Sequence, residues 1–115
     1  MTATEWICAR CGVTVSFMPG AVQPAGLPAN WERVNGAAHC LGCLRKLAGE
    51  RRSATLSGEE SRLDRRRANA EGRIEFELLR APDRCDTRIA RACGTSVVAV
   101  KGVRERLRAY PTRPV

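Results

Sequence analysis

Two pairs of cysteines constrain the fold of this chain more than any other feature. The pairs are Cys8-Ala-Arg-Cys11 and Cys40-Leu-Gly-Cys43. Because each pair has two intervening residues, one short turn can direct both of its thiolates at a single cation. Four thiolates form the tetrahedral ligand set that Zn²⁺ prefers in closed structural sites. The sequence therefore predicts one structural Zn²⁺ bound by all four side chains.

Other uses of these thiols stay open. A single pair would be ambiguous between metal binding and redox chemistry, but two pairs that bracket a loop-rich segment favour a metal. A four-thiolate iron–sulfur cluster is a further alternative, although nothing in the sequence indicates electron transfer. Oxidation of zinc thiolates, as in a redox sensor, is neither required nor excluded. His39 is the only histidine, and because the cysteine set is complete we expect it near the site or at the surface, not as a ligand.

Length and composition limit the size of any core. The chain has 115 residues, enough for one modest domain or two very small ones. Aromatic residues make up only 4%, so a core must rest on Leu, Val, Ile and Ala. We expect Trp6 and Trp31 to form the small core of the cysteine segment, with stacking on bases as the alternative. A domain of about 45 residues is marginal without a staple, and a structural metal supplies one.

The sequence lacks the signals of a membrane or secreted protein. No apolar run approaches the ~18 residues that a membrane span needs. The first residues lack a basic start followed by an apolar stretch. We therefore expect a cytoplasmic protein with reduced thiols and no membrane partner.

Positive charge is concentrated in the second half of the chain. The net charge is +8; residues 1–50 hold four Lys or Arg against three Asp or Glu, whereas residues 51–115 hold sixteen against nine. This asymmetry predicts a polyanionic partner for the second half. Eighteen of the twenty cations are Arg, which suits phosphate and guanine contacts. A GC-rich genome would also explain the preference for Arg, but not the asymmetry.

Composition shifts along the chain predict four segments. They are a four-cysteine module at 1–49, a basic linker or helix at 50–70, a helical domain at 71–109 and a tail at 110–115. Glycines and prolines between the cysteine pairs indicate loops with short strands at 13–17 and 32–34. A short helix is expected to start at Leu44. Ser57 and Glu60 have the spacing of a capping box for a helix that follows them.

Apolar residues recur at helical spacing in three stretches of the segment 71–109. The residues predicted to face inward are Ile74, Leu78, Ile89, Ala90, Cys93, Val100, Val103 and Leu107, with Phe76 and Leu79 as further candidates in the first stretch. Asp83 or Asp86 is expected to cap the second stretch, Gly94 to end it, and Ser96 to cap the third. Cys85 and Cys93 are interpreted as partly buried packing residues and not as ligands.

Two stretches resemble known small motifs. Trp6-Ile-Cys-Ala-Arg-Cys-Gly12, with Leu27-Pro-Ala-Asn-Trp31 and the closing cysteine pair, is similar to the zinc knuckles of actinobacterial and phage proteins. Residues 86–105 resemble the helix-turn-helix of bacterial regulators. The matching positions are Ile89, Ala90, Gly94, Ser96, Val100 and Val103. Thr95 and Gly102 depart from that pattern, because a larger aliphatic is usual at the first position and Gly costs helix stability at the second.

These resemblances imply a mainly α protein with a small zinc-stapled β/loop module and a C-terminal trihelical helix-turn-helix domain. The implied function is a small bacterial or phage transcriptional regulator, associated with the nucleoid, which reads the major groove of double-stranded DNA with the helix 96–108. Candidates for base contacts are Ser96, Val97, Val98 and Lys101. Candidates for phosphate contacts are Arg84, Arg88, Arg91, Arg104 and Arg108. A homodimer or larger complex would supply further specificity.

Other functions fit the same residues. An adaptor would dock its zinc module on RNA polymerase or another protein, and trihelical units can mediate such contacts. A metal-dependent nuclease would need a general base and an activating metal, for which His39 alone is insufficient. We therefore expect a protein that is not an enzyme.

Overall fold

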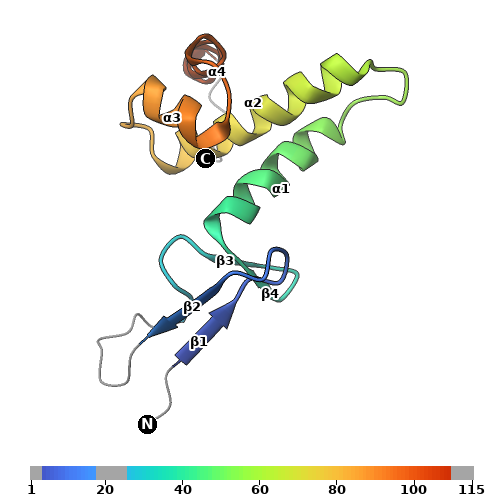
Figure 1. Ribbon diagram of the computed structural model, residues 1–115. Helices are drawn as coiled ribbons and strands as arrows, with labels where there is room; N and C mark the ends of the chain where they lie inside the picture. The colour runs from blue at the N-terminus through green and yellow to red at the C-terminus, as the bar shows by residue number, and fades with distance from the viewer. Residues whose placement is uncertain (1–3, 18–25, 110–115) are drawn as a thin grey trace. The chain divides into compact units, whose positions relative to one another are not determined.

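The computed structural model describes residues 4–17 and 26–109, which contain four helices and four strands (Figure 1). The chain divides into two compact units, Met1–Leu44 and Arg45–Val115. The protein is mainly helical, with two small antiparallel sheets, as the sequence predicts. The tail predicted at 110–115 lies outside the described residues.

The first hairpin of the first unit presents the first cysteine pair. Strand β1 (Thr4–Ile7) pairs antiparallel with β2 (Thr14–Phe17), which lies within the strand predicted at 13–17. The register places Trp6 opposite Val15. The turn between the strands therefore holds the residues from Cys8 to Val13.

The second hairpin precedes the second cysteine pair. Strand β3 (Glu32–Val34), found at its predicted position, pairs with β4 (Ala37–His39). The two turn residues Asn35 and Gly36 have positive φ angles of 51° and 83°, the left-handed conformation that a tight two-residue hairpin needs. The sequence prediction missed β4 because it is only three residues long and lacks β-branched residues.

Helix α1 (Leu41–Ser53) begins directly after Cys40, three residues before the predicted start at Leu44. Its first four residues belong to the first unit and the rest to the second. Helix α2 (Arg62–Arg80) starts with a capping box in which the Asp64 amide donates to Ser61 Oγ (3.1 Å) and the Ser61 amide donates to Asp64 Oδ2 (3.3 Å). The predicted capping box at Ser57 and Glu60 is therefore wrong.

Helix α2 runs without interruption through the boundary expected between 70 and 71. Its charged first half packs against α1, because small residues let the two helices approach closely. A Cβ atom added at Gly72 would lie 2.5 Å from the Ala48 carbonyl oxygen, and one at Gly49 would lie 2.7 Å from the Asn69 carbonyl oxygen. The segment 62–70 is thus the first half of a packed helix and not a separate linker.

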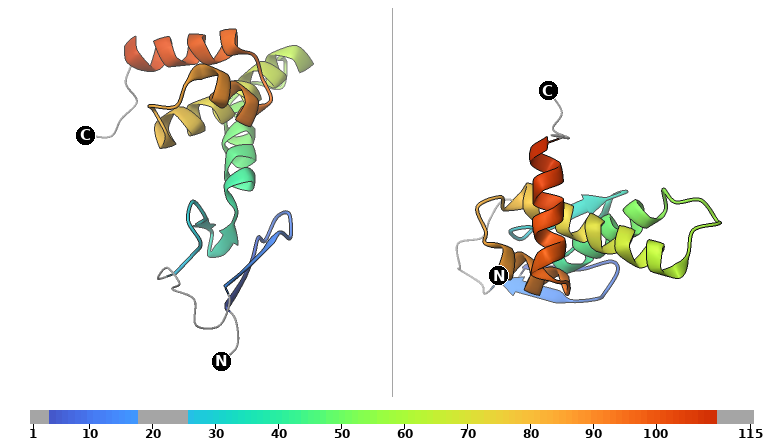
Figure 2. Two further views of the ribbon diagram at one scale, coloured as in Figure 1. Left: turned by 60° about the vertical axis from the view of Figure 1, so that its left-hand side comes forward. Right: turned by 90° about the horizontal axis from the view of Figure 1, so that it is seen from above.

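Helices α3 (Asp86–Cys93) and α4 (Val97–Ala109) complete the second unit, and α4 crosses α2 (Figure 2). The three helices α2, α3 and α4 share one apolar core. Its buried residues are Ile74, Leu78, Ile89, Ala90, Cys93, Val100 and Val103. All seven were predicted to face inward, and Leu107, also predicted, packs against this core while partly buried. Of the two further candidates, Phe76 is partly buried, and the prediction for Leu79 is wrong, because its side chain is 59% exposed.

The turn between α3 and α4 has the predicted caps. Gly94 adopts φ 65°, and the Thr95 amide donates to the Ala90 carbonyl (3.0 Å), which closes the end of α3. Ser96 Oγ accepts a hydrogen bond from the Ala99 amide (3.1 Å) at the start of α4. Gly94 thus ends α3, and Ser96 caps α4.

The start of α3 differs from the prediction. Neither aspartate caps α3; the capping position is Cys85, whose side chain makes no capping hydrogen bond. The Asp86 carboxylate instead accepts from Arg104 Nε (2.8 Å). Cys85 is exposed, so its assignment as a packing residue is also wrong, whereas Cys93 is buried in the core as expected.

A buried ion cluster links α1 to the other helices of the second unit. Glu77 on α2 is fully buried and accepts from Arg45 Nε of α1 (2.8 Å) and from Arg80 Nη2 (2.8 Å). Burial alone would raise the pKa of Glu77, but the hydrogen bonds and charges of these two arginines outweigh it and hold the pKa below its ordinary value. Arg45 Nη1 also donates to the Ala92 carbonyl at the end of α3 (3.1 Å).

Candidate functional site

The four predicted cysteines meet at one point in the first unit. Cys8 and Cys11 lie in the β1–β2 turn, Cys40 follows β4 and Cys43 lies in the first turn of α1, and their sulfur atoms all lie within 4.8 Å of one another. The Cys11 and Cys40 sulfurs are 3.7 Å apart. Four thiolates bound at ~2.3 Å around a tetrahedral Zn²⁺ lie about 3.8 Å from one another. The cluster is therefore positioned to bind one metal ion and is compatible with structural zinc.

Backbone hydrogen bonds fix the first pair of cysteines. The Gly12 amide donates to the Cys8 carbonyl (3.0 Å), and the Cys8 amide donates to the Val13 carbonyl (2.9 Å). Gly12 has φ 78°, a left-handed conformation that favours glycine after the second cysteine. The Cys40 amide points at the Cys8 sulfur (3.4 Å), which joins the two cysteine pairs before any metal is considered.

The electrostatics of the cluster favour a bound cation. Burial opposes ionisation of Cys8, but backbone N–H groups of Cys11, Cys40 and Arg10 stabilise the thiolate and lower the pKa of Cys8 to about 5. Burial and the three neighbouring thiols raise the pKa of Cys43 to about 12. The Cys8 thiol therefore ionises readily, whereas the buried Cys43 thiol resists ionisation beside the other sulfurs. A bound divalent cation would let all four thiols ionise, because its charge offsets the repulsion among the thiolates.

His39 and the two tryptophans lie around the cysteines without joining them. His39 Nδ1 lies 2.9 Å from the Ala37 carbonyl, and the ring does not belong to the group of possible metal ligands among the described residues. Trp6 and Trp31 are partly buried, and the Arg33 guanidinium lies 5.7 Å from the centre of the Trp6 ring. His39 therefore lies beside the cluster and outside its ligand set, as predicted, whereas the two tryptophans, predicted to form the core of this segment, are only partly buried.

The residues predicted to contact bases differ in exposure. Ser96, which caps α4, and Val98 and Lys101, in its N-terminal half, are exposed, and Val98 is 79% exposed. Val97, by contrast, packs partly against the core. The exposed face of α4 therefore combines a hydroxyl, an apolar side chain and a cation.

The arginines predicted to contact phosphate also fall into two groups. Arg104 donates to Asp86 Oδ1 and to the carbonyls of Pro82 (2.9 Å) and Arg84 (2.8 Å), so all three of its guanidinium nitrogens are engaged within the chain. Arg84 Nη1 lies 3.9 Å from Glu77 Oε2. Three others are exposed and form no salt bridge with a described residue: Arg88, Arg91 and Arg108.

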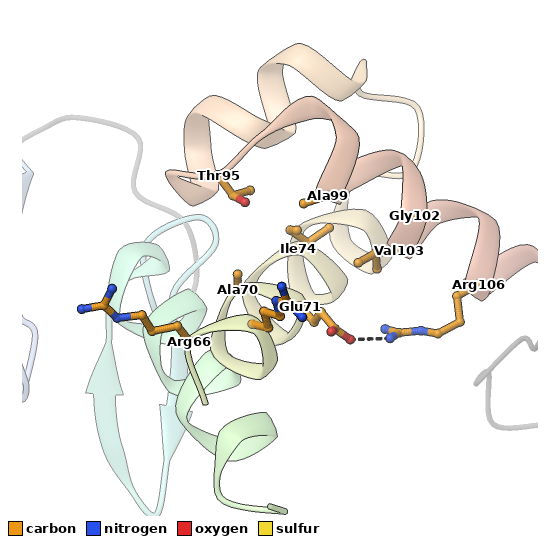
Figure 3. A pocket seen from close by; sticks show the side chains of 10 residues that line it. Arg66, Ala70, Glu71, Ile74, Thr95, Ala99, Gly102, Val103 and Arg106 are labelled. Atoms are coloured by element: carbon orange, nitrogen blue, oxygen red, sulfur yellow. Dashed lines mark hydrogen bonds and ion pairs between the residues drawn. The ribbon is translucent and has the colours of Figure 1, made fainter. Parts of the chain in front are cut away.

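The sequence prediction did not place Arg66 and Arg67. In the structure they line a groove of about 520 Å³ between α2 and α4, together with residues of α4 that adjoin the exposed face (Figure 3). The run of three arginines at 65–67 was visible in the sequence. Its position beside α4 follows only from the crossing of the two helices.

Comparison with known proteins identifies no relative. No protein-family model matches the chain, and neither a curated protein nor a solved structure matches it. Among the helices that the structure describes, none combines the length and the apolar character needed to cross a bilayer. The functional interpretation therefore depends on the residues and their geometry.

Proposed function

We infer that this chain is a zinc-containing, DNA-binding transcriptional regulator that reads the major groove with α4 and has no enzymatic activity. The observation that carries this proposal is the exposed face of α4. Ser96 caps its start and Val98 and Lys101 project from its N-terminal half, while Val100 and Val103 anchor the opposite face in the core. A 79% exposed valine near a lysine supplies an apolar group for a thymine methyl and a donor for a guanine or a phosphate.

The arrangement of α3 and α4 supports the same function. A three-residue turn, closed by Gly94 and opened by Ser96, joins the two helices around a shared core, as in a helix-turn-helix domain. In such domains the second helix enters the major groove with its N-terminal residues toward the bases. Val98 would then contact a thymine methyl, while Lys101 would bind a guanine or a phosphate.

Phosphate contacts are assigned to the arginines that the fold leaves exposed. Arg88 and Arg91 on α3 and Arg108 on α4 meet this condition. Arg84 is a weaker candidate because it lies near Glu77. Arg104 is a positioning residue, since its contacts fix α4 against the turn before α3. A homodimer at the nucleoid would double the number of contacts.

The metal is proposed to be Zn²⁺ in a structural role. Cys8 and Cys43 are buried, and a four-sulfur set leaves no open coordination position for a substrate. The ion would hold the two hairpins and the start of α1 in place.

Selection of bound duplexes from random DNA by the zinc-loaded chain tests the proposal. We expect enrichment of a common motif, and an affinity for that motif that falls about 10- to 100-fold in the variant Val98→Ala plus Lys101→Ala. Lys46→Ala is the matched control, because Lys46 is an exposed lysine on α1. Failure to enrich any sequence, with no duplex binding at low salt, would overturn the proposal.

A second function is favoured by a different observation. In the first unit, Ile7 is 57% and Val13 45% exposed, on either side of the first cysteine pair. Exposed apolar side chains on a zinc module suit a protein partner, as an adaptor for RNA polymerase would need. Purified RNA polymerase should then bind the chain, and Ile7→Ser plus Val13→Ser should weaken that binding while duplex binding stays unchanged. Binding that is unaffected by both substitutions would exclude this surface.

A further inference from the structure

Helix α2 has three exposed arginines without a salt bridge to a described residue, Arg62, Arg66 and Arg67, and only the last two line the groove beside α4. Hydrogen bonds from Ser61 lower the pKa of Asp64, and the charge of Arg67, one turn later, also lowers it. The close approach of α2 to α1 is made at other positions of the helix, Asn69 and Gly72. The charges of Arg66 and Arg67 are therefore available to a partner.

Most other arginines of the helical unit have a structural contact. Eight of them donate to a carboxylate, an amide or a backbone carbonyl of the same unit, or lie beside a carboxylate: Arg45, Arg52, Arg65, Arg73, Arg80, Arg84, Arg104 and Arg106. Arg106, for example, binds Glu71 Oε2 (2.6 Å) and Glu75 Oε2 (2.8 Å). The structure thus separates the arginines that hold the fold from those that face outward.

Arg66 and Arg67 border the proposed DNA-reading helix. They form one side of the groove between α2 and α4, and Thr95, Ala99 and Gly102 form the other side. Thr95 precedes Ser96, and Ala99 follows Val98, so the groove adjoins the residues assigned to base contacts. In Figure 3, Arg66 extends away from α2, whereas the Arg106 guanidinium is held by Glu71.

The two flanks of α4 differ in charge. On the flank formed with the turn before α3, three carboxylates, of Asp83, Asp86 and Glu105, lie among the basic residues. On the α2 flank, the groove contains one carboxylate, Glu71, which Arg106 and Arg52 neutralise (2.6 and 3.5 Å). Three arginines stand against one carboxylate among the residues that line the α2 flank, whereas four cations stand against three carboxylates on the other flank. The larger excess of positive charge on the α2 flank favours a polyanion.

We propose that Arg66 and Arg67 bind the phosphates of a DNA strand that lies along the groove between α2 and α4. The DNA interface is then formed by two helices and not by α4 alone. Small side chains at Ala99 and Gly102 leave room for the strand, and a Cβ added at Gly102 would meet no atom within 4 Å. This inference rests on the proposed function, because α4 must face the duplex for the groove to receive a strand.

Phosphate contacts have a distinct signature. Each one releases a condensed counterion, so the slope of log affinity against log salt concentration changes by about 0.9 per contact in duplex DNA. Contacts to phosphate carry no sequence information. Loss of two arginines from the groove should therefore weaken binding to all sequences and reduce the salt dependence, without changing the preferred motif.

The test is a salt titration of duplex binding by the full, zinc-loaded chain, over about 50 to 200 mM salt. For Arg66→Ala plus Arg67→Ala we expect the slope to fall by about two, with an unchanged motif. Arg66→Lys plus Arg67→Lys should keep most of the slope. Lys46→Ala plus Arg51→Ala is the matched control, because it removes the same charge from exposed positions of α1. Because all these side chains are exposed, the thermal unfolding midpoints should agree.

Each outcome decides the inference. An unchanged slope, or an equal fall in slope for the α1 control, would overturn it. An unchanged slope would also indicate that Arg66 and Arg67 bind an acidic protein and not DNA. A changed motif would overturn the assignment to phosphate. A wild-type chain without duplex affinity would instead overturn the proposed function, so the two failures are distinguishable.

Discussion

The two compact units are stabilised in different ways. In the first unit the buried residues among those described are Cys8, Pro28, Cys43 and Leu44, and two of these four belong to the cysteine cluster that is positioned to bind a metal ion. The second unit has a core of seven buried residues from three helices and a buried carboxylate with two arginine partners. Because the first unit has so few buried apolar side chains, we expect its fold to depend on a bound metal, whereas we expect the second unit to fold on packing alone.

Their exposed surfaces differ as well. The first unit exposes the apolar side chains Ile7 and Val13, and the second exposes unpaired arginines beside α4. We therefore expect different partners for the two units: the first unit offers exposed apolar side chains, and the second offers exposed positive charge. Four substitutions or treatments test how far this difference extends.

Removal of the metal should have the largest effect. Structural zinc contributes on the order of 10 kcal/mol to folding of such a module. We expect a strong chelator to collapse the amide resonances of residues 4–44 in the full chain, while those of α2, α3 and α4 persist. Cys40→Ser plus Cys43→Ser should behave like the chelated protein. If the resonances of both units persisted, or if those of both collapsed, the proposed difference in how the two units are stabilised would be wrong.

Glu77→Gln should destabilise the helical unit by about 3 kcal/mol, because it leaves two arginines beside a neutral buried group. Urea unfolding followed by helical circular dichroism measures the change. Glu59→Gln is the matched control, since Glu59 is exposed. A loss no larger than that of the control would show that the ion cluster does not hold α1 to α2.

The effect of Glu77→Gln should also depend on pH. Because the folded-state pKa of Glu77 lies below its ordinary value of 4.5, the carboxylate stabilises the fold fully above that pH. This contribution is lost as the pH falls through the lowered pKa. The stability difference between wild type and variant should therefore shrink in acid, and a difference that stays constant would contradict the assigned cause.

Gly72→Ala should destabilise the helical unit by about 1–3 kcal/mol, because the added Cβ would lie 2.5 Å from the Ala48 carbonyl oxygen and 2.7 Å from Arg52 Cβ. The thermal unfolding midpoint measures it. An unchanged midpoint would mean that the close approach of α1 and α2 contributes little.

Gly102→Ala should have the smallest effect and the opposite sign. Its Cβ would meet no atom within 4 Å, so the gain in helix propensity, about 1 kcal/mol, is not opposed by a clash. The same thermal measurement compares it with Gly72→Ala. Destabilisation at this position would show that α4 packs differently from the structure.

The parts of the fold set by local pattern could be predicted from the sequence. The cysteine spacing predicted the cluster of four cysteines, and the spacing of Ile89, Val100 and Val103 predicted which faces of α3 and α4 are buried. Gly94 and Ser96 ended and began helices as expected, because both act through their own backbone or side chain.

The parts of the fold that depend on long-range contacts could not be predicted from the sequence. The charged segment 62–70 looks solvated in sequence, and only its packing on α1 through Gly72 makes it part of a long helix. Asp86 is a residue type that commonly caps helices, but its carboxylate instead accepts a hydrogen bond from Arg104, which lies 18 residues later in the sequence. Arg65 and Arg66 look equivalent in the sequence, but only Arg65 donates to a backbone carbonyl, that of Ser57, in the folded chain.

An amide spectrum of the nitrogen-labelled, zinc-loaded full chain, titrated with the selected duplex, tests most directly which unit meets DNA. We expect shifts at Ser96, Val98 and Lys101 on α4 and at Arg66 and Arg67 on α2, with little change in residues 4–44. Shifts confined to the first unit, or no shifts at saturating duplex, would contradict the assignment of DNA binding to the helical unit.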